Sequence, residues 1–168
     1  MPSRLRNPSA AVRATVRSAA FGAATLLLAP LLGPSPASAA GTFVEKTVDV
    51  PRATKVPVGI TFEKSALQWV ESQNDPKEKD VAEAAKSDPK GKTWVLLRFT
   101  YANEGYVSHK VNLRVLLLDA SGAVLAEGGR KSALDSQQKK DTISFPIHVR
   151  TLDWPKAAKL KVMATLYD

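Results

Sequence analysis

Three tryptophans are the residues of this sequence best suited to direct contact with a ligand. Trp69, Trp94 and Trp154 each fall near a predicted loop or strand end. An indole ring offers a broad apolar surface for stacking on a sugar or a peptide, and its N–H can donate a hydrogen bond. Tryptophan is also highly buried on average, so Trp94 could instead pack beneath a neighbouring helix, and Trp154 could close one end of the fold. We predict Trp94 and Trp154 as the ligand-binding residues.

The residue types that bind metals or act as nucleophiles lack the spacing that such chemistry needs. His109 and His148 are the two histidines, and neither belongs to an H-x-H or H-x-x-x-H pair that could bind a metal. Acidic residues gather between 71 and 83, but they are interspersed with lysines and do not follow the spacing of a calcium loop. The chain has no G-x-S-x-G elbow and no phosphate-binding glycine loop. We therefore expect no catalytic residue, no metal and no cofactor. The alternative is a small secreted hydrolase whose dispersed carboxylates are brought together by folding.

Composition narrows the classes of partner. The chain has no cysteine, which excludes disulfides, thiolate metal ligands and a cysteine nucleophile. Its net charge of +8 includes four arginines near the N-terminus, so the remainder carries +4. That excess allows weak contact with anionic polymers but falls short of the basic density that nucleic-acid binding requires. Lys156, Lys159 and Lys161 indicate either a small basic patch or charges that keep an edge strand from pairing with another chain.

The first 39 residues have the order of a secretory signal peptide. Four arginines precede an apolar run from Ser18 to Leu32, and the small residues Ala37-Ser38-Ala39 follow it. The apolar run has 15 residues and contains Pro30, whereas a membrane-spanning helix needs about 20 apolar residues. We expect cleavage after Ala39, with Ala40 as the second candidate position. We also expect an exported bacterial protein of the periplasm or the extracellular space, with no stable membrane insertion after processing. An uncleaved membrane anchor is the alternative.

Residues 40–168 have the length of a single domain, and their dominant pattern is that of β-strands. Apolar and polar residues alternate, which places apolar side chains on one face of an extended strand and polar side chains on the other. If Val95, Leu97 and Phe99 point inward, Trp94 lies on the outer face. The alternating segments are 93–101, 111–118, 143–149 and 159–166, with shorter ones at 48–50 and 56–62. Six or seven such strands predict an all-β fold, an antiparallel β-sandwich of two sheets.

Turn residues separate the predicted strands. Asp119-Ala-Ser-Gly122 predicts a tight turn, because aspartate can accept hydrogen bonds from the turn backbone and glycine can adopt a positive φ. This turn would join 111–118 to a short strand at 123–126, with Gly128-Gly129 in the loop that follows. Asn103-Glu104-Gly105 predicts a second turn, which ends the strand before it.

One segment interrupts the β pattern. Asp75-Pro76-Lys77-Glu78 has the residues of a helix start with Asp75 as the N-cap, and Ser87-Asp88-Pro89 has those of a helix end. We therefore expect a short helix over residues 76–86. Its apolar face is small, so the helix is predicted to lie on the surface, within an insertion at 63–92 between strands.

Several features from Leu96 onward occur in the order of a known class of exported domain. Asn103 follows one strand, valine and leucine alternate in the next, and Leu118-Asp119-x-x-Gly122-x-Val124 comes after it. Strands at 143–145 and 160–166 complete the order. Over residues 93–167 the chain resembles the exported FxLYD-type immunoglobulin-like domains. The resemblance implies an extracytoplasmic, non-catalytic, immunoglobulin-like β-sandwich, and it assigns no functional site.

Together these features predict an exported, non-catalytic module that binds a protein or a glycan of the cell envelope or the extracellular space. Within that class, a carbohydrate-binding module that uses exposed tryptophans is the main alternative. Nucleic acid is not expected as a partner.

Overall fold

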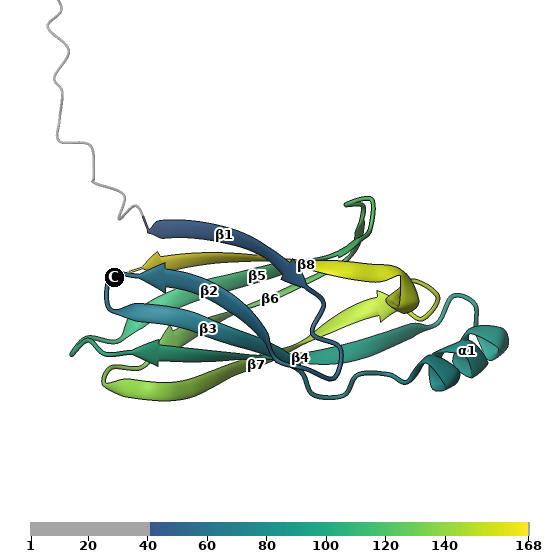
Figure 1. Ribbon diagram of the computed structural model, residues 1–168, viewed down its shortest axis with the longest axis horizontal. Coiled ribbons are helices and arrows are strands. Elements are labelled where there is room, and N and C mark those ends of the chain that lie inside the picture. Colours follow the sequence, from purple (N-terminus) through teal and green to yellow (C-terminus); the bar gives the residue numbers. More distant parts are fainter. Residues whose placement is uncertain (1–40, 168) are drawn as a thin grey trace, which may run out of the picture. The chain divides into compact units, whose positions relative to one another are not determined.

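The computed structural model describes residues 41–167, which form two antiparallel four-stranded sheets packed as a sandwich (Figure 1). The predicted leader, residues 1–39, lies outside the described residues. One sheet has the strand order β1-β8-β5-β6 and the other has the order β2-β3-β4-β7. The elements are β1 (Thr42–Asp49), β2 (Val56–Phe62), β3 (Ser65–Ser72), α1 (Glu78–Ser87), β4 (Lys92–Asn103), β5 (His109–Asp119), β6 (Val124–Leu134), β7 (Gln138–Arg150), the short 3-10 helix η1 (Trp154–Lys156) and β8 (Ala157–Tyr167). The predicted all-β sandwich is confirmed, with eight strands in place of six or seven.

The inward-pointing side chains of the strands form one core between the sheets. The predicted alternations bury most of their inward apolar side chains, as at Phe99 in β4, Val115 in β5, Phe145 in β7 and Val162 in β8, while Val56 and Leu166 are partly buried. The rings of Phe99 and Phe145 stack across neighbouring strands with their centroids 5.6 Å apart. Burial of one such side chain contributes about 1.5–3 kcal/mol, so repeated alternation can stabilise a chain that has no disulfide.

The turn between β5 and β6 forms where the sequence predicts it. Asp119 Oδ1 accepts hydrogen bonds from the backbone N–H groups of Ser121 and Ala123 at 2.8 and 2.9 Å. Gly122 has a φ of 89°, a conformation that other residues rarely adopt. The Ser121 hydroxyl also donates a hydrogen bond to the Asp119 carboxylate. That bond first, and the backbone hydrogen bonds after it, hold the pKa of the Asp119 carboxyl below its usual value.

The β5–β6 hairpin is longer than predicted. Gly128 and Gly129 lie inside β6 and not in a loop, so that prediction is wrong. A Cβ on Gly129 would lie 2.5 Å from the Leu113 carbonyl oxygen, and one on Gly128 would lie 3.2 Å from Ile147 Cγ1. The two glycines therefore let β6 pass close to β5 on one side and to β7 on the other.

Strand β3 is missing from the sequence-based prediction, which assigns its residues to an insertion. Its pairing with β4 shifts register between Leu67 and Trp69, which places Gln68 in a bulge. Leu67 and Val70 are both fully buried although they are three residues apart. An extra residue in a strand breaks the period of two, so the alternation is not visible in the sequence.

Helix α1 occupies the predicted segment but begins differently. Its N-cap is Lys77, without a side-chain hydrogen bond, so the prediction of Asp75 as the N-cap is wrong. Burial raises the pKa of the Asp75 carboxyl, and Arg52 and the backbone N–H of Ala53 oppose that rise. Val81 joins the core, and α1 lies at the end of the sandwich opposite the C-terminus (Figure 1).

Candidate functional site

Trp154 lies in the interior of the sandwich and not on its surface. It begins η1, between β7 and β8, and the residue is only 2% exposed. The Arg52 guanidinium lies 4.6 Å from the centre of the indole ring and donates hydrogen bonds to the carbonyl oxygens of Trp154 and Ala157 at 2.7 and 2.9 Å. The expectation that Trp154 is exposed is wrong, because its ring belongs to the core cluster and Arg52 lies over it. The alternative, that Trp154 closes one end of the fold, agrees with this position.

Trp94 has the outward position that the strand alternation predicts. It lies on β4 beside the buried Val95 and is 50% exposed. The side-chain amide of Asn74 holds the backbone next to it: Nδ2 donates to the Trp94 carbonyl oxygen at 3.2 Å, and Oδ1 accepts from the Leu96 N–H at 2.5 Å. Asn74 thereby continues the β3–β4 ladder beyond the end of β3 and fixes the strand that carries Trp94.

Trp69 lies on the same outer face as Trp94. It pairs directly with Thr100 of β4 and with Pro57 of β2, and directly paired residues point to the same side of a sheet. Thr100 follows the buried Phe99 and therefore points outward, as Trp69 does with 43% exposure. We define the tryptophan face as the following outward residues of this sheet and its border: Lys55, Pro57, Trp69, Glu71, Trp94, Leu96, Arg98, Ser144 and Pro146.

The two exposed tryptophans stand far apart along the strands. Trp69 is level with Thr100, and Thr100 lies six residues from Trp94 on β4. A strand rises about 3.3 Å per residue, so about 20 Å separates the positions of the two side chains along the sheet. A ligand that contacts both indoles must therefore be extended.

Charged residues of both signs lie between the tryptophans. Arg98 and Glu71 are direct partners across β4 and β3, with 3.5 Å between Arg98 Nη1 and Glu71 Oε1. Lys55 Nζ lies 3.5 Å from Glu71 Oε2. These distances are longer than the roughly 2.7–3.2 Å of a direct hydrogen bond. The three groups are thus held near one another, and their donors and acceptor remain able to bind a ligand.

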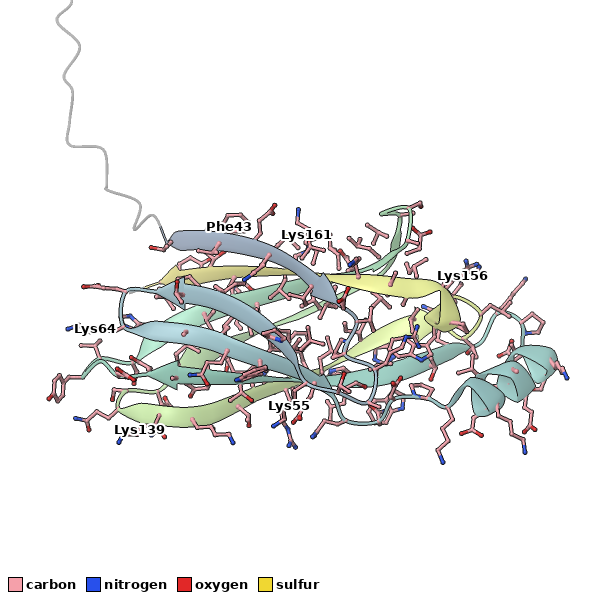
Figure 2. All side chains as sticks on the ribbon, in the orientation of Figure 1. Phe43, Lys55, Lys64, Lys139, Lys156 and Lys161 are labelled. Carbon is pink, nitrogen blue, oxygen red and sulfur yellow. The ribbon has the colours of Figure 1, made fainter. Side chains whose placement is uncertain are left out.

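The outer face of the other sheet is built differently, from close ion pairs between neighbouring strands. The pairs are Lys159–Asp49 at 2.6 Å, Arg114–Glu127 at 2.7 Å and Lys161–Glu45 at 2.9 Å. We define these six residues as the paired face. Its exposed aromatic residues, Phe43 and Tyr167, lie near strand ends. Figure 2 shows Lys161 and Phe43 on the side of the sandwich formed by β1 and β8, and Lys55 on the opposite side.

Other residues that could do chemistry line a hollow of about 470 Å³ between the ends of the two sheets. Glu63, Ser65 and His109 are among its lining residues. The Ser65 Oγ is buried and forms no hydrogen bond with another described residue, so it lacks the serine–histidine bond of a hydrolytic triad. His148 is exposed on the polar side of β7, as predicted. Within residues 41–167, no group of histidine and acidic residues is arranged to hold a metal ion.

Of the nine residues of the tryptophan face, only Trp94 belongs to the sequence-based site, and Trp69, Arg98 and Glu71 are among those that the site omits. Trp69 is named there as a tryptophan but is not selected, and Arg98 and Glu71 are not considered as ligand contacts. Arg98 lies between Leu97 and Phe99, so the alternation of β4 could have placed it outward. Glu71 could not have been placed, because β3 itself is not predicted.

Comparisons with known proteins leave the chain without an assigned family. No protein-family model matches it, and no curated protein matches it. The resemblance of residues 93–167 to FxLYD-type domains therefore stays a prediction. In the part of the chain that the structure describes, no helix is both long enough and apolar enough to cross a membrane.

Proposed function

We propose that this protein is an exported, non-catalytic β-sandwich that binds a ligand of the cell envelope or extracellular space through the tryptophan face. The observation that carries the proposal is the position of Trp69 and Trp94, each about half exposed, on one face of one sheet. Tryptophan is highly buried on average, so two half-exposed indoles on one face support a role in contact with a partner.

The position of the first strand supports export with removal of the leader. Strand β1 begins at Thr42, shortly after the predicted cleavage position at Ala39. A Cβ on Gly41 would lie 2.5 Å from the Leu166 carbonyl oxygen, so the chain already packs against β8 at residue 41. Cleavage after Ala39 would leave all eight strands intact. Mass spectrometry of the mature protein is expected to find Ala40 at its N-terminus; retention of residues 1–39 would contradict this part of the proposal.

Binding to isolated cell envelopes tests the role of the tryptophan face. Residues 40–168, which contain every described strand, would be sedimented with envelopes of the producing bacterium. The Trp69→Ala/Trp94→Ala double variant is expected to bind at least about tenfold more weakly, because aromatic anchors dominate binding energy. Tyr106→Ala is the matched control, since Tyr106 is 84% exposed but lies in the β4–β5 loop outside the face. Equal binding by the double variant and the control would overturn the proposal.

A further inference from the structure

We propose that the ligand of the tryptophan face is a hydroxyl-rich polysaccharide chain that lies along β3 and β4, with one sugar ring stacked on Trp69 and another on Trp94. This inference rests on the proposed function and specifies the class of ligand. A sugar ring has a flat side made of C–H groups, which packs against an indole, while its hydroxyl groups point to the edges where polar side chains can reach them.

The separation of the tryptophans requires an extended ligand. About 20 Å of strand lies between the two side-chain positions, and both indoles project from the same side of the sheet. A monosaccharide or another small molecule can stack on one indole only. A polysaccharide is a chain of sugar rings, so one molecule can place a ring on each of two separated indoles, and both contacts are of the same kind.

The residues between the tryptophans suit hydroxyl groups. Each sugar hydroxyl is both a donor and an acceptor of hydrogen bonds. Arg98 and Lys55 supply donors, Glu71 supplies acceptor oxygens, and the 3.5 Å contacts among them leave those atoms without a short bond to one another. The face thus offers both kinds of partner along the path from Trp69 to Trp94.

The same arrangement argues against a globular protein as the ligand. In protein–protein interfaces the energetically dominant aromatic residues gather near the centre, and charged residues are depleted there. On the tryptophan face the order is reversed, with Trp69 and Trp94 at the two ends and Arg98 and Glu71 between them. Pro57 lies on one side of the path, and on the other side Ser144 and Pro146 pair with Arg98 and Leu96, and the exposed His148 pairs with Trp94.

A chain-length series tests this inference. Cello-, chito- and malto-oligosaccharides from disaccharide to octasaccharide, and solubilised peptidoglycan strands, would be titrated into residues 40–168 by calorimetry. For at least one series we expect the affinity to rise with chain length and to level off once the chain spans both indoles. Trp69→Ala and Trp94→Ala should each lose at least about tenfold with the long chains and little with the shortest ones. Trp94→Phe, which keeps an aromatic ring, should retain more affinity than Trp94→Ala.

The outcomes separate this inference from the proposed function. If no glycan binds, or if affinity does not depend on chain length, the polysaccharide assignment is wrong. If the double variant also loses binding to whole envelopes, and protease treatment of those envelopes abolishes binding by the unmodified protein, the ligand is a protein and the proposed function stands alone. If the double variant binds envelopes as well as the unmodified protein does, both fail.

Discussion

The two outer faces of the sandwich are both formed by antiparallel strands, but their charged side chains make different contacts. On the paired face, Lys159, Arg114 and Lys161 each lie within 2.9 Å of a carboxylate on the adjacent strand, so these six charges balance one another. On the tryptophan face, the corresponding contacts are 3.5 Å long, and two indoles stand half exposed beside them. Both faces carry exposed aromatic rings, Phe43 and Tyr167 on the first and Trp69 and Trp94 on the second, so the difference lies in the charged groups, which are closely paired on the first face and more loosely paired on the second. The contrast supports the proposal that the sheet of β2, β3, β4 and β7 presents the binding surface.

The largest expected change in the free energy of unfolding distinguishes the buried Trp154 from the two tryptophans of the tryptophan face. Trp154→Ala should lower the free energy of unfolding by about 3–5 kcal/mol, because it empties a buried site in the core. Trp69→Ala and Trp94→Ala should each lower it by less than Trp154→Ala does, since both side chains are about half exposed. Urea denaturation of the three variants measures this. A loss at Trp94→Ala as large as that at Trp154→Ala would show that Trp94 serves to stabilise the fold, which would break the comparison.

A smaller loss of stability is expected when Tyr101 is altered, a residue on the inner side of β4, the strand that also carries Trp94. The Tyr101 hydroxyl donates to Asp141 Oδ2 at 2.9 Å and accepts from the Asp135 N–H at 3.1 Å. Tyr101→Phe removes both bonds and should cost about 1–3 kcal/mol of unfolding free energy. The same variant should leave glycan binding unchanged, because Tyr101 is buried beneath the tryptophan face. Weaker binding without loss of stability would contradict this division between the two sides of β4.

The role of Tyr101 in stability can also be tested by the dependence of the unfolding free energy on alkaline pH. Burial raises the pKa of Tyr101 from 10.0 to about 12, so between these values the folded protein keeps a proton that the unfolded chain has lost. The free energy of unfolding should therefore fall as pH rises through this range. The Tyr101→Phe variant should lack this part of the fall. Denaturation of both proteins at about pH 9 and about pH 11 provides the measurement, and an identical pH dependence would show that Tyr101 is not the group responsible.

The smallest effect is expected on the paired face. Lys159 and Asp49 are both largely exposed, so their 2.6 Å contact should contribute less than about 1 kcal/mol, and salt should weaken it further. A double-mutant cycle of Lys159→Ala and Asp49→Ala gives the coupling free energy. Neither variant should alter ligand binding. A tenfold loss of binding in Lys159→Ala would place the ligand on the wrong face for this account.

Much of the fold follows from sequence pattern where one side of a strand is wholly buried. The alternation in β4, β5, β7 and β8 is regular because every second residue reaches the core. Strand β3 escapes prediction because the bulge at Gln68 breaks its period. Most of β6 is hidden for a different reason, since its side chains are largely exposed at a sheet edge and Gly128 and Gly129 have the composition of a loop.

The candidate site was only partly predictable for a related reason. The outward position of Trp94 depends on local alternation, and the prediction holds. The burial of Trp154 depends on Arg52, about a hundred residues away in the chain, and no local pattern reports that contact. The shared face of Trp69 and Trp94 depends on the register between β3 and β4, which only the folded chain defines.

The central claim is that the ligand lies on the tryptophan face, and the three indole N–H signals of the protein test it most directly. In a two-dimensional NMR titration of residues 40–168 with the tightest-binding oligosaccharide, the account predicts that the Trp69 and Trp94 signals shift and saturate together. The Trp154 signal should remain unchanged, because its ring is buried beneath Arg52. Unshifted Trp69 and Trp94 signals, with shifts confined to β1, β8 and β5, would contradict it.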